Sequence, residues 1–285
     1  MIALKRLRHL PFLVAGLLAL AAALPRAAFA QGKVEAQYKA TLAGIPIGKG
    51  DWTIDIGDTH YTAAATGKTT GLIRVFTGGE GTSAVRGTIS GGKLSAALYA
   101  ATIKTRNKTD EVRLVLSNGN VKELKVDPPP EEDPERVPVT EAHQHGIVDP
   151  MSGSLLQVPG SGNLMAPESC HRRLSVFDGR LRYDLELAYK RMEQVKAEQG
   201  YAGPALVCAV YFTPVAGFIP SRTAIKYITK QRDIEVWLVP IAGTRLLAPF
   251  RAQGPTPIGE FRLQAHKFIT AAGPIRASAN GTKTQ

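Results

Sequence analysis

Apolar and polar residues alternate with a period of two along most of this chain. Residues 51–56 read DWTIDI, and residues 181–187 read LRYDLEL. Successive side chains of a β-strand point to opposite faces, so this pattern predicts strands with one buried face and one wet face. No long segment with the 3.6-residue spacing of a helix occurs after residue 30. The predicted fold class is therefore mainly β.

Turn signals divide the N-terminal half into an antiparallel meander. Gly91-Gly92 separates strands predicted at Val85–Ile89 and Leu94–Ile103. Asn118-Gly119 stands between two alternating segments, which is a strong signal for a two-residue hairpin turn. We therefore expect strands that are neighbours in the chain to pair with each other.

The C-terminal half contains further strands and room for one or two short helices. Leu206–Phe212 is apolar on both faces and should lie centrally in a sheet, whereas Ile234–Leu238 and Phe261–Ala265 alternate. Asp149-Pro150-Met151 predicts the start of a helix of two or three turns. Ser221–Lys230 allows one or two more turns.

An acidic, proline-rich segment, residues 127–138, separates the two halves. Proline cannot donate to a sheet ladder and clustered acids repel one another, so we interpret this segment as a solvated loop. It either joins the halves of a single β-rich domain, residues 31–272, or divides two subdomains. We favour one sheet that crosses both halves. Residues 273–285 are small and polar, and we expect a disordered tail there.

The N-terminus has the features of an export signal. Lys5, Arg6 and Arg8 precede the apolar stretch Leu10–Leu24, and the segment ends in the small-x-small sequence Ala-Phe-Ala. We predict a signal peptide over residues 1–30, cleaved between Ala30 and Gln31. An uncleaved anchor helix is the alternative. The apolar run is short for a hydrocarbon core of about 30 Å, so we expect no stable transmembrane anchor after cleavage.

The charge of the chain is positive but dispersed. The formal net charge is +11, and loss of the four basic residues of the signal peptide, which has no acid, leaves +7. No run of Lys and Arg exceeds two residues, and aromatic residues make up 7% of the chain. Nucleic-acid grooves combine clustered cations with interleaved aromatic residues, so we expect no nucleic-acid partner. The charge points instead to the anionic surfaces of the envelope.

Cys170 and Cys208 are the two cysteines of the chain. In an oxidising compartment, an intramolecular disulfide is the interpretation that we favour. It would close a loop of 38 residues, for which chain entropy predicts roughly 4 kcal/mol of stabilisation. Two free thiols, or a metal pair with His171, are the alternatives. Two Cys and one His without a fixed fourth ligand are weak evidence for zinc.

Two glycine-containing segments resemble phosphate-binding loops but lack required positions. Gly67-Lys68-Thr69-Thr70 has Thr62 where the first glycine of such a loop would stand, and Gly44–Lys49 has one residue too few between its glycines. We interpret the glycines of both segments as turn residues. No G-x-S-x-G nucleophile motif occurs.

His143 and His145 are the close histidine pair of the sequence. With Glu141 or Asp149 as a third ligand, they could hold a metal. A solvated stretch beside the acidic loop is the interpretation that we favour. We therefore predict no catalytic residue, no cofactor and no metal site, and expect a protein that is not an enzyme.

Four segments carry a resemblance to a known family: residues 38–48, 149–152, 176–184 and 234–259. The third follows Cys170 and reads VFDGRLRYD. Together these segments resemble an exported family catalogued as domain of unknown function 3108. The resemblance implies a periplasmic, β-rich protein of Gram-negative bacteria without an established reaction. It also implies a bent antiparallel sheet, built as a half-open barrel or a β-spiral.

The resemblance supplies no functional residues to transfer. Asp178-Gly179 fits a turn between two strands, whereas the roles of Arg180 and Arg182 stay open. Arg182 should share a strand face with Asp184 and Glu186, where cross-strand ion pairs are favoured over ligand binding.

Three functions are compatible with these observations. The first is a non-enzymatic periplasmic protein whose apolar β face binds a lipid, an acyl chain or a lipidated partner. The second is a structural or scaffolding envelope protein that engages a protein partner through sheet edges or loops. The third is a hydrolase with an unrecognised site near His143 and His145. We favour the first. The sequence does not specify an oligomeric state.

Overall fold

The computed structural model describes residues 31–70 and 78–273. The predicted signal peptide, the cleavage after Ala30 and the tail from residue 274 onward fall outside the described residues and stay predictions. Within the described ranges, no helix has both the length and the apolar character needed to cross a bilayer.

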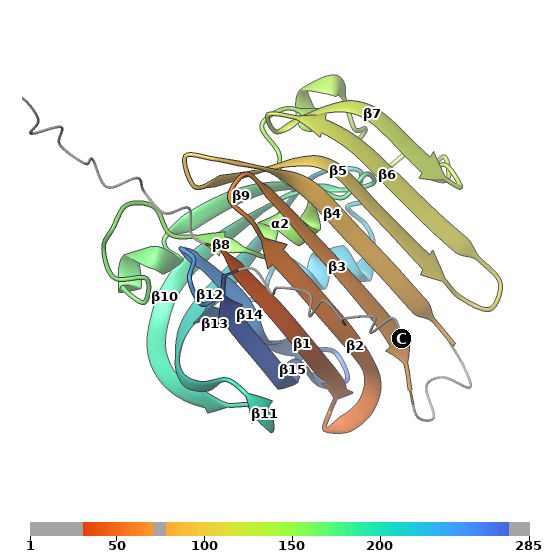
Figure 1. Ribbon diagram of the computed structural model, residues 1–285. Coiled ribbons are helices and arrows are strands. Elements are labelled where there is room, and N and C mark those ends of the chain that lie inside the picture. The colour runs from red at the N-terminus through yellow and green to blue at the C-terminus, as the bar shows by residue number, and fades with distance from the viewer. Residues whose placement is uncertain (1–30, 71–77, 274–285) are drawn as a thin grey trace, which may run out of the picture.

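One sheet contains all fifteen strands found in the described residues (Figure 1). In chain order the strands are β1 (Gly32–Leu42), β2 (Ile45–Ile56), β3 (His60–Thr69), β4 (Glu80–Ser90), β5 (Lys93–Lys104), β6 (Thr109–Ser117), β7 (Asn120–Asp127), β8 (Leu156–Gln157), β9 (Arg172–Phe177), β10 (Arg182–Lys196), β11 (Gln199–Gly200), β12 (Ala202–Ala216), β13 (Glu235–Pro240), β14 (Leu246–Thr256) and β15 (Gly259–Ala272). The short helices are the 3-10 turns η1 (Glu141–Gln144) and η2 (Pro167–Cys170) and the α-helices α2 (Pro150–Gly153) and α3 (Thr223–Ile228).

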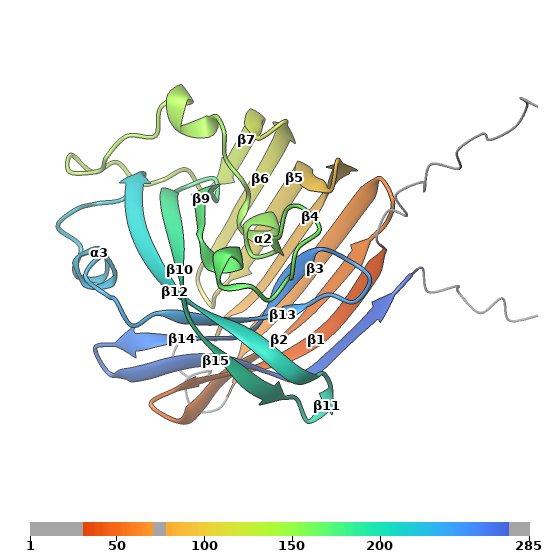
Figure 2. The ribbon, with the colours of Figure 1, turned by 90° about the vertical axis from the view of Figure 1, so that its left-hand side faces the viewer.

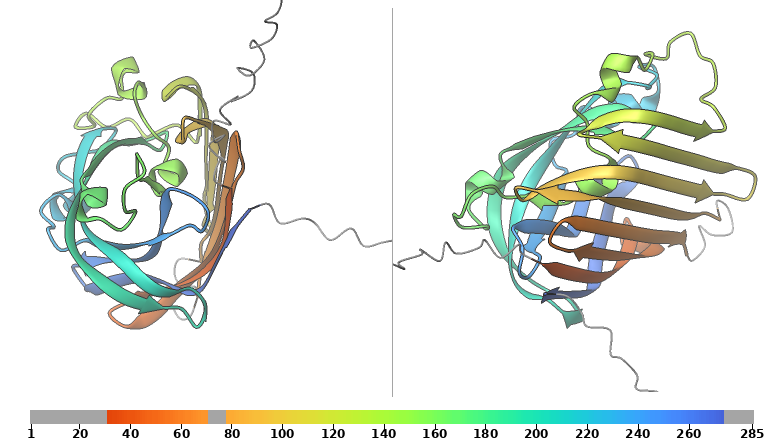
Figure 3. Two further views of the ribbon diagram at one scale, coloured as in Figure 1. Left: turned by 60° about the vertical axis from the view of Figure 1, so that its left-hand side comes forward. Right: turned by 45° about the horizontal axis from the view of Figure 1, so that its top comes forward.

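The strand order is β7-β6-β5-β4-β3-β2-β1-β15-β14-β13-β12-β10-β9, with β8 beside β14 and β11 beside β15. Strands from both sides of residues 127–138 therefore belong to the same sheet. The N-terminal strands form a broad twisted wall, and the C-terminal strands curl over one of its faces (Figures 2 and 3). The terminal strands β7 and β9 are not paired with each other, so the predicted bent, half-open antiparallel sheet is confirmed.

Predicted turns and strand faces agree with the structure. Asn118 and Gly119 have φ angles of 50° and 75°, as a two-residue turn with two left-handed positions requires. Along β2, Trp52, Ile54 and Ile56 are buried while the residues between them are exposed. The N-terminal strands therefore have the solvent-exposed face and the buried face that the sequence predicts.

The centre of the C-terminal half is buried on both sides. Ala205 and Val207 of β12 belong to one apolar cluster, and Leu206 and Cys208 belong to a second cluster on the opposite face. This confirms the central position expected of Leu206–Phe212.

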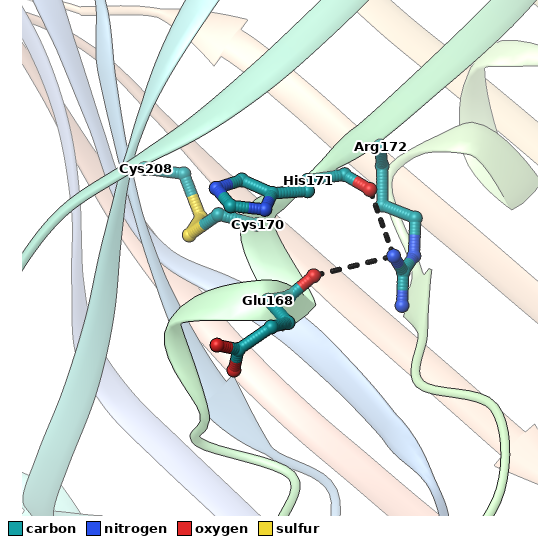
Figure 4. Close-up of a disulfide and its surroundings, with 5 residues drawn as sticks. All are labelled: Glu168, Cys170, His171, Arg172 and Cys208. Carbon is teal, nitrogen blue, oxygen red and sulfur yellow. Dashed lines mark hydrogen bonds between the residues drawn. A yellow bond between two sulfur atoms is a disulfide. The ribbon is translucent and has the colours of Figure 1, made fainter.

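The disulfide joins Cys170, at the end of η2, to Cys208 in the middle of β12 (Figure 4). The two Cα atoms are 5.7 Å apart, and both residues are fully buried in the second cluster. The favoured pairing is thus present, and neither free thiols nor a metal pair with His171 describes these cysteines.

The predicted helix at Asp149 is shorter than expected. Asp149 caps it, and Pro150 occupies the first turn as predicted, but α2 has one turn and not two or three. The chain must become extended again at Leu156 to pair with β14, so it leaves the helix at Ser154. α3, at Thr223–Ile228, lies within the segment predicted to make one or two turns.

Candidate ligand-binding groove

A groove of about 770 Å³ lies on the face of β1–β5 that α2 covers. Figure 2 shows α2 in the space between this wall and the C-terminal strands. The groove is open to solvent and its lining is mainly apolar. Its volume falls within the range of about 300–1,000 Å³ that is usual for ligand pockets.

Three glycines form the floor of the groove. Gly50, Gly67 and Gly81 lie directly opposite one another on the neighbouring strands β2, β3 and β4. Opposite residues of an antiparallel pair share one face, so this row presents backbone without side chains. Backbone groups inside a sheet are already hydrogen-bonded, which leaves the floor with few free polar groups. The row ends at Ile103 of β5, whose side chain lines the groove.

Aromatic residues border this floor. Tyr38 of β1 lies opposite Gly50, and Trp52 and Tyr99 also line the groove. A second cross-strand row starts at Trp52 and continues with small residues: Ala65, Ser83 and Ala101. The groove therefore exists because, beyond Tyr38 and Trp52 and short of Ile103, two adjacent rows of one sheet face carry glycine, alanine and serine.

This arrangement corrects our interpretation of the glycines. Gly44 does occupy a turn, with a φ of 81°, but Gly48 and Gly67 lie inside β2 and β3. A glycine inside a strand marks a place where side-chain volume is missing or another group approaches closely. The spacing of two between Gly48 and Gly50 puts both on one strand face. That spacing is the signal in the sequence by which the groove was detectable.

Helix α2 closes one side of the groove with Met151 and Ser154. The hydroxyl of Ser83 on β4 donates to the sulfur of Met151 over 3.1 Å. Tyr61 of β3 and Ser152 share a buried hydrogen bond of 2.6 Å between their hydroxyls. These two contacts fix the helix against the wall that carries the groove.

The tyrosine hydroxyls and the indole of the groove are neutral, and the charged residues in its lining, Lys49, Asp51, Lys68 and Glu80, alternate along their strands with the residues of the floor. The Tyr38 hydroxyl donates to the carbonyl of Pro249 over 2.6 Å, and burial raises its pKa. Burial also raises the pKa of Tyr99, and the negative charges of Asp149 and Asp178 add to this shift. The indole Nε1 of Trp52 is buried without a hydrogen-bond partner. Such an interior suits a hydrocarbon chain better than an ionic ligand.

The segment VFDGR, residues 176–180, lies at the seam between the two ends of the sheet and not in the groove. Val148 bridges to β9 by hydrogen bonds with Ser175 and Phe177, while the neighbouring Ile147 donates to Gly119 of the β6–β7 turn. The seam therefore joins segments from residues 119, 147–148 and 175–177.

Asp178 and Arg180 complete this seam. Asp178 Oδ1 accepts the N–H groups of Arg180 and Leu181, which confirms the predicted turn. The Arg180 guanidinium contacts Asp110 of β6 over 3.1 Å and the carbonyl of Pro128 over 2.9 Å. Arg180, whose role the sequence left open, is therefore a link between the β9–β10 turn and β6–β7.

The charged residues of β10 form ion pairs. Glu186 lies opposite Arg173 of β9, with 3.8 Å between the charged groups, which is the cross-strand pairing expected for this face. Arg182 instead contacts Asp184 on its own strand, with an N–O distance of 2.7 Å.

The histidine pair lies at η1, away from the groove lining. His143 Nδ1 accepts the N–H of Thr140 over 3.1 Å, and His145 lies 3.8 Å from Glu141. The fully buried Asp149 uses its carboxylate to cap α2 and is not part of this cluster. Among the residues that the structure describes, no three His, Cys, Asp or Glu side chains gather as a metal site would require.

The fold and the groove define a class of half-open β-sheet protein with an apolar cleft on its concave wall. Within that class, the chain belongs to the family described as "Protein of unknown function (DUF3108)", which matches residues 37–265.

A solved structure from Brucella abortus, described as a beta-barrel-like protein of domain of unknown function DUF1849, is similar to this chain with 9% identity and a TM-score of 0.45. The similarity covers 85% of this chain and 98% of that one. No curated protein matches the sequence.

Proposed function

We propose that this is a non-enzymatic periplasmic protein that binds a lipid, or the acyl chain of a lipidated partner, in the groove. The single observation that carries the proposal is the glycine row Gly50, Gly67 and Gly81 on an otherwise apolar face. An acyl chain needs volume and an apolar lining but no hydrogen-bond donors, and the groove supplies that combination. Each buried methylene group contributes about 0.8 kcal/mol.

The dimensions of the groove support the same ligand class. Its glycine row crosses from β2 to Ile103 on β5, which is three strand spacings or about 14 Å. Half of a bilayer's hydrocarbon core is about 15 Å thick. One acyl chain from a single leaflet therefore matches the length of this row.

The test replaces glycines in the floor of the groove by leucine, so that side chains occupy the groove while the strands keep their backbone conformation. A Cβ at Gly67 would meet only the Lys49 carbonyl at 3.9 Å, and a Cβ at Gly81 would meet its nearest atom at 3.7 Å. Gly67→Leu and Gly81→Leu should therefore fold and displace two or three methylene groups of a ligand. We expect each to weaken binding of a fluorescent fatty acid by at least about tenfold. Ala84→Leu, on the exposed face of β4, is the matched control and should bind normally.

Native mass spectrometry of the purified protein supplies the second readout. The wild-type protein should carry co-purified lipid, and Gly67→Leu should carry less. A wild-type protein without lipid that also fails to bind the fluorescent fatty acid contradicts the proposal.

The scaffolding alternative has one observation in its favour. β7 ends the sheet order, so the edge opposite β6 is not paired with another strand of the described chain. Charged residues such as Lys122, Glu123 and Lys125 lie exposed on this strand, and charges on an edge strand discourage pairing. Crosslinking that recovers one stoichiometric protein partner, from a preparation free of lipid, would favour the scaffold.

A further inference from the structure

Three strongly exposed isoleucines surround one end of the groove. Ile258 is 73% exposed, Ile45 is 62% exposed and Ile103 is 55% exposed. Ile45 begins β2 directly after the β1–β2 turn, and Ile258 lies in the β14–β15 turn. These two turns are in contact, because the N–H of Ala43 donates to the carbonyl of Glu260 over 2.9 Å. Strongly exposed apolar residues on two adjoining turns are a feature of surfaces that another apolar phase covers.

A row of lysines crosses the same end of the sheet on the opposite face. Lys39, Lys49 and Lys68 lie directly opposite one another on β1, β2 and β3. The row continues with Glu80 on β4 and Lys104 on β5. All five side chains are exposed. They alternate along their strands with residues that face the groove.

One part of this row, Lys39, Lys49 and Lys68, brings like charges directly opposite each other. Like charges directly opposite each other destabilise a strand pair. Lys39 is compensated by Glu198 at 2.8 Å, but Lys49, Lys68 and Lys104 have no ion pair with any residue that the structure describes. A negatively charged partner would relieve that repulsion.

Two acids near this end are already in ion pairs. Glu260 contacts Arg262 over 2.8 Å, and Asp110 contacts both Lys108 and Arg180. Within the row, Glu80 lies opposite Lys68 and Lys104, so one glutamate stands among four lysines. Asp51, two residues from Lys49 on the same strand face, accepts hydrogen bonds from Gln37 and Thr66.

The two turn isoleucines, Ile45 and Ile258, lie further along the strands than the lysine row, whereas Ile103 adjoins Lys104 at the height of the row. Four residues separate Ile45 from Lys49, which corresponds to about 13 Å in a strand. Lys68 is one residue from the end of β3, and Lys104 is the last residue of β5. The β1–β2 hairpin therefore projects beyond the lysine row. Interfacial segments bury their apolar residues about 5–10 Å below the head groups, a depth at which long lysine side chains still reach the anionic surface.

We propose that this end of the molecule docks on the surface of an anionic lipid bilayer. The exposed isoleucines of the two turns enter the interface, and Lys49, Lys68 and Lys104 contact anionic head groups. The proposal rests on the proposed function, because it lets an acyl chain pass between the bilayer and the groove at Ile103 without crossing water. An anionic bilayer has both the apolar interior that the exposed isoleucines of the two turns require and the negative surface charge that the lysine row requires.

The experiment measures binding to vesicles by co-sedimentation. The protein is produced from the full-length gene, and its N-terminal residue is determined by mass spectrometry. Vesicles of phosphatidylcholine alone are compared with vesicles that contain phosphatidylglycerol. We expect binding to the anionic vesicles that weakens as salt is added, and little binding to the neutral ones.

Two double variants test the two parts of the surface. Lys49→Gln/Lys68→Gln should weaken binding to anionic vesicles about tenfold or more. Ile45→Ser/Ile258→Ser should produce a loss of similar size. The matched controls are Lys93→Gln/Lys122→Gln, at the opposite ends of β5 and β7, and Ile269→Ser, whose side chain is 42% exposed on β15. Equal binding by the variants and the controls, or equal binding to neutral vesicles, overturns the docking proposal.

A parallel titration with the fluorescent fatty acid separates this proposal from the proposed function. Gly67→Leu should still bind anionic vesicles while losing the fatty acid. Ile45→Ser/Ile258→Ser, which changes no residue of the groove lining, should still bind the fatty acid. A wild-type protein that binds the fatty acid but not the vesicles refutes docking alone, and the reverse result refutes the groove's function alone.

Discussion

Asp149 combines a structural task with an electrostatic cost. Its Oδ1 accepts the N–H groups of Met151 and Ser152, each over 3.0 Å, while its Oδ2 is buried without a partner. Burial raises the pKa of this carboxyl above its ordinary value of 3.8, although the backbone hydrogen bonds oppose the shift. The folded protein therefore binds this proton more tightly than the unfolded chain does.

The pH dependence of stability should report this cost. Because the folded pKa of Asp149 is raised, its contribution lowers the free energy of unfolding as pH rises from 3.8 through the folded pKa. Asn also caps helices but does not ionise. We expect Asp149→Asn to lose less stability than wild type between about pH 4 and pH 8 in urea unfolding. Identical pH profiles for the two proteins would contradict this expectation. Asp178, whose pKa is also raised, remains in both.

Gly87 shows how closely one residue of the wall is packed. It lies opposite Tyr61, and a Cβ there would approach the Ser95 carbonyl to 2.2 Å and Tyr61 Cε1 to 2.6 Å. We expect Gly87→Ala to lower the free energy of unfolding by about 1–3 kcal/mol, as overpacking does. Gly81→Ala, in the same strand with open space above it, should change stability by less than about 1 kcal/mol. Equal effects of the two substitutions in urea unfolding would argue against this packing.

Among the elements, the β9–β10 turn holds the half-open sheet together through Arg180. That side chain contacts Asp110 on β6 and main-chain carbonyls at the end of β7, strands that lie at the other end of the sheet order. Because no strand pairing joins β7 to β9, these contacts and the Val148 bridge hold the seam.

Removal of the Arg180 side chain should loosen the seam without unfolding the sheet. We expect Arg180→Ala to cost about 1–3 kcal/mol, because its hydrogen bonds are charge-assisted and partly buried. Hydrogen exchange should become faster in β6 and β7 before it changes in β12. Arg173→Ala, which removes a largely exposed ion pair with Glu186, should cost less than about 1 kcal/mol. Uniform exchange changes across the sheet would show that Arg180 is not a local link.

Considered as a whole, the molecule has two apolar clusters, and the disulfide belongs to the second. Cys170 and Cys208 close a loop of 38 residues. Cys170→Ala/Cys208→Ala should therefore lower the free energy of unfolding by up to about 4 kcal/mol while the far-ultraviolet circular dichroism stays that of a β protein. Two free sulfhydryls in the unreduced, denatured wild-type protein would be incompatible with this pairing.

The groove and the proposed docking surface are likewise properties of the whole sheet. The groove is built by glycines on three strands and covered by a helix more than 60 residues further along the chain. The exposed isoleucines Ile45 and Ile258 belong to two turns that are separated by more than 200 residues in the chain. The two turns are in contact because β1 pairs with β15. Neither surface belongs to one segment of the sequence.

The sequence alone was sufficient to predict features that depend on the residues of one strand or one turn. Alternation in residues 51–56 identified a strand with one buried face, and Asn118-Gly119 identified a hairpin. The capped turn at Asp149 was recognisable because it has a strong local preference. The disulfide was predictable for another reason, since the chain has two cysteines and was predicted to be exported to an oxidising compartment. The predicted length of α2 was wrong because Leu156 pairs with β14, and this contact between distant segments ends the helix after one turn.

Only the tertiary structure decided which residues lie opposite one another. Gly50, Gly67 and Gly81 form a floor, and Lys39, Lys49 and Lys68 form a charged row, because the register of β1–β4 aligns them. A shift of one residue in that register would turn every side chain of a strand to the other face. Register depends on turns, bulges and the distant pairing of β1 with β15, so no pattern within a single segment could have revealed the groove's complete lining or the seam at Arg180.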